Sequence, residues 1–182
     1  ACAGAGRLAE TVVVTGDADA AAIARAAGAR VVPDHAPRRG MNAAVALGLG
    51  AAAGGGAEAA LVLTADLPLV RPEDLDAVAA AAPPAPSATL VPSRDGTGTN
   101  AMLLRPPAAL TPQLGPDSLA RHTAQALARA VAVCRLGLPR LAVDVDTPAD
   151  LAAALEGPAA AATRAAAARL RVAERLGAGS AL

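Results

Sequence analysis

The sequence predicts an α/β fold in which a mostly parallel sheet carries helices on both faces. Short apolar or β-branched runs that suit strands alternate along the chain with Ala- and Leu-rich runs that suit helices. The first such elements form a βαβ unit, because residues 11–15 and 30–32 suit strands and flank a helical stretch over 20–27 that Gly28 ends. The length of 182 residues fits a single domain, 1–182.

The later elements are predicted from helix and strand boundary signals. Asn42 is expected to start a helix over 43–53, and acids after Pro72 suit the first turn of another helix. The expected elements after residue 53 are a strand over 59–64, a helix over 74–82, strands over 88–92 and 99–105, a helix over 118–130, strands over 131–136 and 141–146, a helix from Pro148, and a C-terminal Ala/Arg helix within 159–182.

The composition limits the classes of function. The net charge is zero, all 16 basic residues are arginine, and no aromatic side chain is present, so a nucleic-acid groove is not supported. The apolar stretch 43–63 contains three consecutive glycines and Glu58, which argues against a membrane span. Cys2 and Cys134 form no CxxC pair, and no signal peptide is recognisable. We therefore expect a soluble cytoplasmic protein without membrane or nucleic-acid partners.

Acidic residues follow two of the predicted strands. Asp144 and Asp146 lie one residue apart, so on a strand they would share a face, and Asp66 ends another strand. Two aligned carboxylates repel each other unless a cation lies between them, and oxygen ligands suit Mg²⁺ that also carries substrate phosphates. The stretch 147–150 is also a capping box with Pro148 at the first helical position, so Asp146 is either a metal ligand or part of a helix cap.

Three loops have the composition of anion sites. The stretch 95–100, DGTGTN, has two glycines and two hydroxyls and suits either an anion loop or a hairpin turn. The stretch 115–122, GPDSLARH, begins a helix whose free N–H groups favour an anion; alternatively, Ser118 or Asp117 is an ordinary cap and His122 is packed. In the stretch 38–44, Asn42 is either a cap or a nucleobase contact, and Arg38 and Arg39 would steer a triphosphate.

Taken together in chain order, these segments resemble one family. GMNAA at 40–44, ADLP at 65–68, GTGTN at 96–100, GPDSLARH at 115–122 and DVDTP at 144–148 are similar to the phosphoenolpyruvate or 2-phospho-L-lactate guanylyltransferases of coenzyme F-420 biosynthesis. The resemblance covers roughly residues 11–155. It implies a three-layer, Rossmann-like nucleotidyltransferase fold of the nucleotide-diphospho-sugar transferase type.

The resemblance also implies a reaction and its residues. A phosphate oxygen of phosphoenolpyruvate or 2-phospho-L-lactate would attack the α-phosphorus of GTP and release pyrophosphate. By motif, the catalytic residues would be Asp66 and Asp144, and Asp66, Asp144 and Asp146 would bind Mg²⁺. The acid substrate would be bound by Thr99, Gly115 and Ser118, and the nucleotide by Gly40 and Asn42.

The chain departs from this family at its start. It begins at Ala1, in what resembles the end of a first helix, and has no equivalent of the opening strand and basic loop that grip the triphosphate in such enzymes. We expect either an N-terminal truncation or a divergent protein that binds substrate without turnover. The alternatives to a guanylyltransferase are a related molybdopterin or sugar-phosphate nucleotidyltransferase and a non-catalytic phosphoenolpyruvate-binding module.

Overall fold

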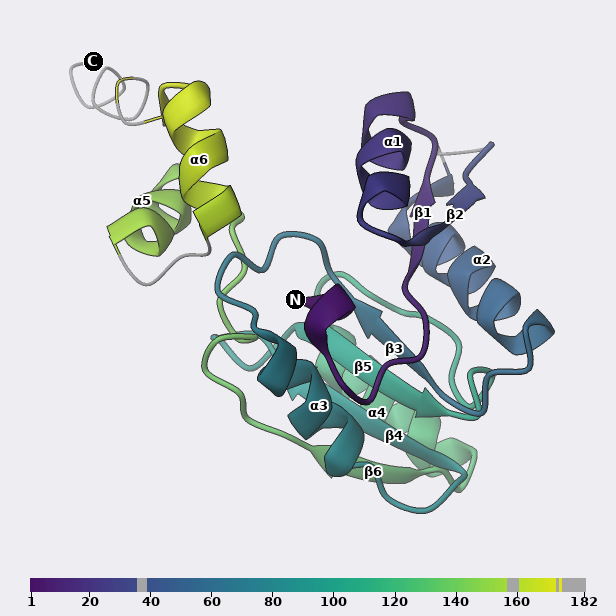
Figure 1. The fold of residues 1–182 in the computed structure, drawn as a ribbon. Helices are drawn as coiled ribbons and strands as arrows, with labels where there is room; N and C mark the ends of the chain where they lie inside the picture. The colour runs from purple at the N-terminus through teal and green to yellow at the C-terminus, as the bar shows by residue number, and fades with distance from the viewer. Residues whose placement is uncertain (36–38, 157–160, 173, 175–182) are drawn as a thin grey trace.

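The strands in the described part of the chain form two sheets. The computed structural model describes residues 1–35, 39–156, 161–172 and 174 (Figure 1). After a 3₁₀ turn at Cys2–Gly4, the elements are β1 (Val12–Thr15), α1 (Ala18–Ala26), β2 (Arg30–Pro33), α2 (Met41–Gly54), β3 (Ala60–Leu63), α3 (Pro72–Ala80), β4 (Ser87–Pro92), β5 (Thr99–Arg105), α4 (Ser118–Ala128), β6 (Ala132–Arg135), α5 (Pro148–Glu156) and α6 (Ala161–Arg169).

The sheet directions agree with the predicted α/β class, with one strand reversed. β1 and β2 pair in parallel, and the larger sheet has the order β3-β5-β4-β6. β5 runs antiparallel to both β3 and β4, whereas β4 and β6 are parallel, so three of its four strands share one direction. The reversal follows from the short turn over 93–98, because only antiparallel neighbours can be joined by so few residues.

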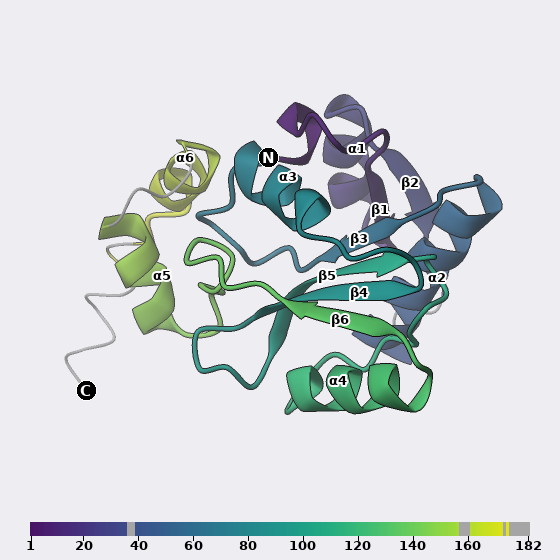
Figure 2. The same ribbon diagram turned by 90° about the horizontal axis from the view of Figure 1, so that it is seen from below.

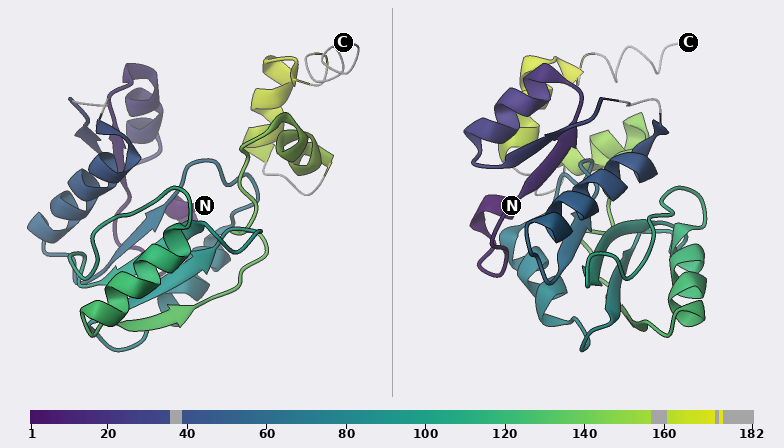
Figure 3. Two further views of the ribbon diagram at one scale, coloured as in Figure 1. Left: turned by 180° about the vertical axis from the view of Figure 1, so that it is seen from behind. Right: turned by 90° about the vertical axis from the view of Figure 1, so that its right-hand side faces the viewer.

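Helices cover both faces of the larger sheet. α3 lies on one face and α4 on the other, as Figures 1 and 2 show, and the view from behind in Figure 3 shows α4 across the sheet. Alternate residues of β5 serve the two cores: Met102 and Leu104 pack with Leu119 of α4, and Leu103 packs with Leu75 of α3. This three-layer arrangement confirms the predicted layers and leaves the ends of the strands free for a site.

Helix α2 connects the two sheets. Its Val45 and Leu49 pack in the core on the α4 side, and its other contacts reach β1. A Cβ added at Gly48 would lie 3.1 Å from Val14 Cγ2, so this glycine allows α2 to approach β1 closely. The helix begins two residues earlier than a cap at Asn42 would allow, because Gly40 is the N-cap; the prediction of Asn42 as the cap is wrong.

The predicted strand over 141–146 is also wrong. These residues have no regular strand structure, and their backbone bonds lead to single partners instead of a ladder. Asn100 Nδ2 donates to the Leu141 carbonyl at 3.0 Å, and the Val145 N–H donates to the Asp66 carbonyl at 3.1 Å. Leu141 itself is fully buried beside α3. Its apolar side chain therefore anchors a loop to the core and does not belong to a strand.

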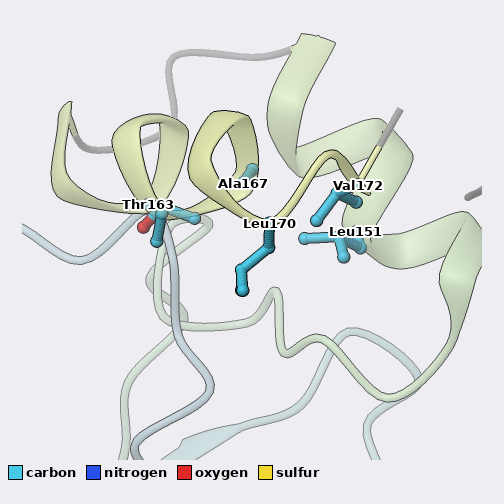
Figure 4. A pocket seen from close by; sticks show the side chains of 6 residues that line it. Leu151, Thr163, Ala167, Leu170 and Val172 are labelled. Atoms are coloured by element: carbon cyan, nitrogen blue, oxygen red, sulfur yellow. The ribbon is translucent and has the colours of Figure 1, made fainter. Parts of the chain in front are cut away.

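The C-terminal region contains α5 and α6, and residues 159, 160, 173 and 175–182 of the predicted Ala/Arg helix lie outside the described residues. A hollow between these helices is lined by one hydroxyl residue and five apolar ones (Figure 4): Leu151, Thr163, Ala166, Ala167, Leu170 and Val172. No helix in the described ranges is long and apolar enough to cross a membrane.

Candidate active site

A cavity of about 600 Å³ lies beyond the carboxyl ends of β3 and β4 and the N-terminus of α4. This is the position at which ligands gather in open α/β sheets. The cavity is lined by six of the eight predicted site residues: Asp66, Thr99, Gly115, Ser118, Asp144 and Asp146. Gly40 and Asn42 do not line it, although Met41 between them does. The fold therefore brings the predicted acid-substrate and carboxylate residues to one place.

One wall of the cavity is acidic. Asp66 follows β3, and the hydrogen bond from Val145 to its carbonyl places the loop of Asp144 and Asp146 beside it. The charge of Asp144 raises the pKa of Asp146, with smaller contributions from burial and from the charges of Asp66 and Asp150. These carboxylates are therefore close enough to repel one another.

The acidic wall offers carboxylate oxygens, which are the type of ligand that a hard cation binds. Carboxylate oxygens are the ligands of Mg²⁺, which usually takes one or two of them and completes its shell with water and phosphate. In the described part of the chain, no three acidic, histidine or cysteine residues are arranged so as to hold a metal by themselves. Pairs of these carboxylates with phosphate oxygens of a nucleotide remain compatible with this geometry.

The capping box next to this wall does not use Asp146. The Thr147 hydroxyl accepts from the Asp150 N–H at 3.2 Å, and Asp150 Oδ2 accepts from both the N–H and the hydroxyl of Thr147, at 3.0 and 2.7 Å. The hydrogen bond from the Thr147 hydroxyl is the largest cause of the lowered pKa of Asp150, and the bond from the Arg94 guanidinium lowers this pKa further. The capping box is confirmed, and the Asp146 carboxylate is left facing the cavity.

The glycine loop over 93–98 is a hairpin turn that is bonded to itself. Asp95 accepts from the Ser93 hydroxyl at 2.6 Å and from the Thr97 N–H at 3.0 Å, so its pKa lies far below the usual range. The N–H groups of Gly96 and Gly98 are bonded to Ser93. The hairpin alternative is therefore correct, and the anion-cradle alternative is wrong for these amides, because they already have partners.

A second part of the cavity lining, the hydroxyl wall, carries the buried hydroxyls of Thr99 and Ser118, and His122 lies behind it. Thr99, Ser118 and His122 are 4%, 1% and 0% exposed. Ser118 Oγ lies 3.3 Å from Thr99 Oγ1, which lies 3.2 Å from His122 Nδ1. Asp117 is the N-cap, as one alternative predicted, although its side chain makes no cap bond, and Ser118 is the first helical residue rather than the cap. His122 is packed, as the alternative for that residue predicted.

Gly115 forms the rim of this wall. Its φ of +110° is a conformation that side chains rarely adopt, and a Cβ there would lie 3.7 Å from Arg121 Nη2. Asn42 holds the preceding residue: its Oδ1 accepts from the Leu114 N–H at 2.7 Å and its Nδ2 donates to the Leu114 carbonyl at 3.1 Å. Asn42 thus fixes α2 to the Gly115 turn, while its predicted nucleotide contact stays a prediction.

Sequence reasoning missed several residues of the site. Asn100, 5% exposed, anchors the loop of Asp144, and the bidentate Arg140–Asp74 ion pair, at 2.6 and 2.8 Å, ties that loop to α3. Arg94 lines the cavity and pairs with Asp150 at 2.9 Å. Asn100 ends the DGTGTN stretch, but the carbonyl that it binds belongs to Leu141, 41 residues away in the sequence. Arg38 lies outside the described residues, and Arg39 is exposed.

Comparisons with known proteins agree with this arrangement. Residues 1–134 match the model of the MobA-like NTP transferase domain. A crystal structure from Desulfovibrio desulfuricans, assigned as a nucleotide-diphospho-sugar transferase, superimposes with a TM-score of 0.61 at 18% identity and covers 81% of this chain and 66% of its own. The fold is therefore that of the nucleotide-diphospho-sugar transferases.

Curated relatives define the family further. A phosphoenolpyruvate guanylyltransferase from Thermomonospora curvata is 46% identical over 150 residues, which are 81% of this chain and 63% of the relative. A 3-phospho-D-glycerate guanylyltransferase from Phenylobacterium zucineum is 37% identical over 157 residues, 86% and 71% of the two chains. The chain belongs to the MobA-like NTP transferases, within the phosphoenolpyruvate guanylyltransferase family. It spans slightly less than two thirds of the length of the first relatives.

Proposed function

We propose that this chain transfers GMP from GTP to phosphoenolpyruvate and releases pyrophosphate. The observation that carries the proposal is the single cavity lined by both the acidic wall and the Thr99–Ser118 wall, in a chain similar to guanylyltransferases. The substrate's phosphate oxygen forms a bond to the α-phosphorus of GTP as the bond to the pyrophosphate oxygen breaks. Such a reaction requires in-line positioning and neutralisation of charge, and no protein nucleophile.

The residues divide between the two substrates. Thr99, Gly115 and Ser118 bind the three-carbon phosphoacid, and Gly40 and Asn42 lie near the nucleotide. A pair of carboxylates, Asp66 and Asp144, would hold Mg²⁺ together with phosphate oxygens of GTP, to which the bound cation would supply positive charge, and Asp146 lies beside this pair. The mutual repulsion that raises the pKa of Asp146 supports this assignment, because a cation would relieve it.

A second acid substrate is 3-phospho-D-glycerate, favoured by the similarity to the Phenylobacterium protein. The use of 2-phospho-L-lactate as the acid substrate stays a prediction, as does a cytoplasmic role in coenzyme F-420 biosynthesis. A related molybdopterin or sugar-phosphate nucleotidyltransferase stays the alternative enzyme. A non-catalytic binding module is the remaining alternative.

Pyrophosphate release tests the proposal. The chain is incubated with GTP, Mg²⁺ and each of phosphoenolpyruvate, 2-phospho-L-lactate and 3-phospho-D-glycerate, with CTP and ATP as nucleotide controls. We expect release with GTP and phosphoenolpyruvate that requires Mg²⁺. Binding of phosphoenolpyruvate without any release would support the binding module, and release with a sugar phosphate but none of the three acids would support the other nucleotidyltransferases.

A further inference from the structure

His122 is the one fully buried titratable side chain of the described site, and the proposed reaction assigns it no task. Its Nε2 accepts a hydrogen bond from the Gln113 N–H at 3.0 Å. A backbone amide can only donate, so Nε2 carries no proton. A neutral imidazole then has its proton on Nδ1, and the backbone of Gln113 selects this tautomer.

The tautomer determines the direction of the hydrogen bonds to Thr99. With its proton on Nδ1, His122 donates to Thr99 Oγ1 at 3.2 Å, and Thr99 acts as the acceptor. Ser118 Oγ lies 3.3 Å from the same oxygen. The two hydroxyls together carry two protons. One of these protons forms the hydrogen bond between Ser118 and Thr99, whichever of the two residues donates it. The second proton has no acceptor among the described residues, and both hydroxyls line the cavity.

We propose that His122 is a positioning residue that commits the Thr99–Ser118 hydroxyl pair to donate a hydrogen bond into the cavity. A committed donor favours a group that can only accept, a carboxylate or a phosphate, and disfavours a group that can only donate, such as an ammonium. The ligand named here, a three-carbon phosphoacid, rests on the proposed function. Burial, and then the charge of Arg121, lower the pKa of His122 to about 4, so the ring is neutral at pH 7 and acts by its hydrogen bond.

The tautomer can be measured directly in the intact chain. The sequence has two histidines, so His35→Gln leaves the His122 signals alone. Two-bond proton–nitrogen correlation spectra at pH 7 should show a protonated Nδ1 and an unprotonated Nε2. A protonated Nε2, or an imidazolium, would overturn the proposal. This result is independent of whether the chain has guanylyltransferase activity.

A double-mutant cycle tests the effect on ligands. His122→Leu should weaken phosphoenolpyruvate binding about ten-fold and leave GTP binding unchanged, because the leucine cannot donate to Thr99. His122→Asn, which can present an amide donor near the Nδ1 position, should recover part of this loss. In a Thr99→Val background, His122→Leu should have no further effect. Titrations with inorganic phosphate and with pyruvate distinguish whether the phosphate or the carboxylate is the acceptor.

Two results in the cycle would contradict the proposal. One is an equal loss of phosphoenolpyruvate and GTP binding, and the other is a His122→Leu effect that persists in the Thr99→Val background. Melting curves identify variants that unfold, and the tautomer measurement decides the question if His122→Leu does so. If the wild-type chain binds no phosphoacid, the proposed function fails, while the spectra still decide the role of His122.

Discussion

The two walls of the cavity differ in how far their polar groups are already satisfied. On the hydroxyl wall, Thr99 and Ser118 are buried, lie on β5 and α4, and are bonded to each other. On the acidic wall, Asp66 and Asp146 are exposed and Asp144 is half-buried. All three lie on segments without regular structure, and repulsion raises the pKa of Asp146. The first wall is held in place before a ligand arrives and has one hydroxyl proton left to donate, whereas the second has an excess of negative charge.

This difference suggests a division of labour. A preorganised donor site selects a substrate by geometry, since the cost of ordering its side chains is met by the fold. A cluster of repelling carboxylates gains most when a cation neutralises it. Substitutions on the acidic wall should therefore affect turnover and leave the fold intact, whereas substitutions around the hydroxyl wall should also affect stability.

The largest expected effect is that of Asp144→Asn on turnover. Loss of one metal ligand should remove several kcal/mol of transition-state stabilisation, which corresponds to a 10²- to 10⁴-fold lower kcat. The melting temperature should not fall, because the substitution removes like-charge repulsion. Steady-state pyrophosphate release at saturating Mg²⁺ measures the effect, and near-normal turnover would remove Asp144 from the site.

The second prediction concerns acid. Burial lowers the pKa of His122 from its ordinary value of 6.5 to about 4, so between these pH values the unfolded chain binds a proton and the folded chain does not. Stability should therefore fall as the pH decreases from about 6.5 to about 4, by a total on the order of 2–3 kcal/mol. Urea unfolding at a series of pH values measures this, and His122→Asn should remove most of the slope.

The third prediction compares two buried polar side chains on neighbouring strands. Asn100→Ala leaves the Leu141 carbonyl without its donor and should cost about 2 kcal/mol of unfolding free energy. Thr89→Val on β4 is the matched control: Thr89 Oγ1 is buried without a partner in the described structure, so its removal should be neutral or stabilising. Chemical denaturation of both variants checks the pair, and equal losses would contradict the role of Asn100.

The smallest expected effect separates the helix cap from the metal site. Thr147→Ala removes the cap bonds at the start of α5 and should cost about 1 kcal/mol. Asp146→Asn should not destabilise the chain in the absence of metal, because it relieves the repulsion from Asp144. Thermal melts without Mg²⁺ compare the two variants. If Asp146→Asn lowers the melting temperature as much as Thr147→Ala does, Asp146 is part of the helix cap.

The sequence predicts the elements of this molecule better than their interactions. Strand and helix positions such as β5 and α4 follow from local apolar patterns and boundary signals, and motif order identifies most of the residues that line the cavity. The antiparallel direction of β5 stays open in the sequence, because residues 95–100 suit either an anion loop or a hairpin turn and periodicity contains no information on strand direction. The apolar residues 141–143 predict a strand before Asp144, whereas in the structure they form a loop that the buried Leu141 anchors.

The hydrogen bonds that organise the site were not predictable from local sequence. Asn42 and Leu114 are 72 residues apart, Arg140 and Asp74 are 66 apart, and Asn100 and Leu141 are 41 apart. Each of these pairs depends on the packing of separate elements. A motif therefore indicates which residues gather, and the tertiary structure determines which of them contact a ligand and which position the others.

The most direct test of the two-wall account is a crossed binding experiment. Mn²⁺ binding by electron paramagnetic resonance and phosphoenolpyruvate binding by calorimetry are measured on the wild-type chain, Asp144→Asn and Thr99→Val. The account predicts that Asp144→Asn loses most Mn²⁺ binding and keeps phosphoenolpyruvate binding without metal, and that Thr99→Val shows the reverse. If both variants lose both ligands to the same degree, the walls are not independent and the division of labour is wrong.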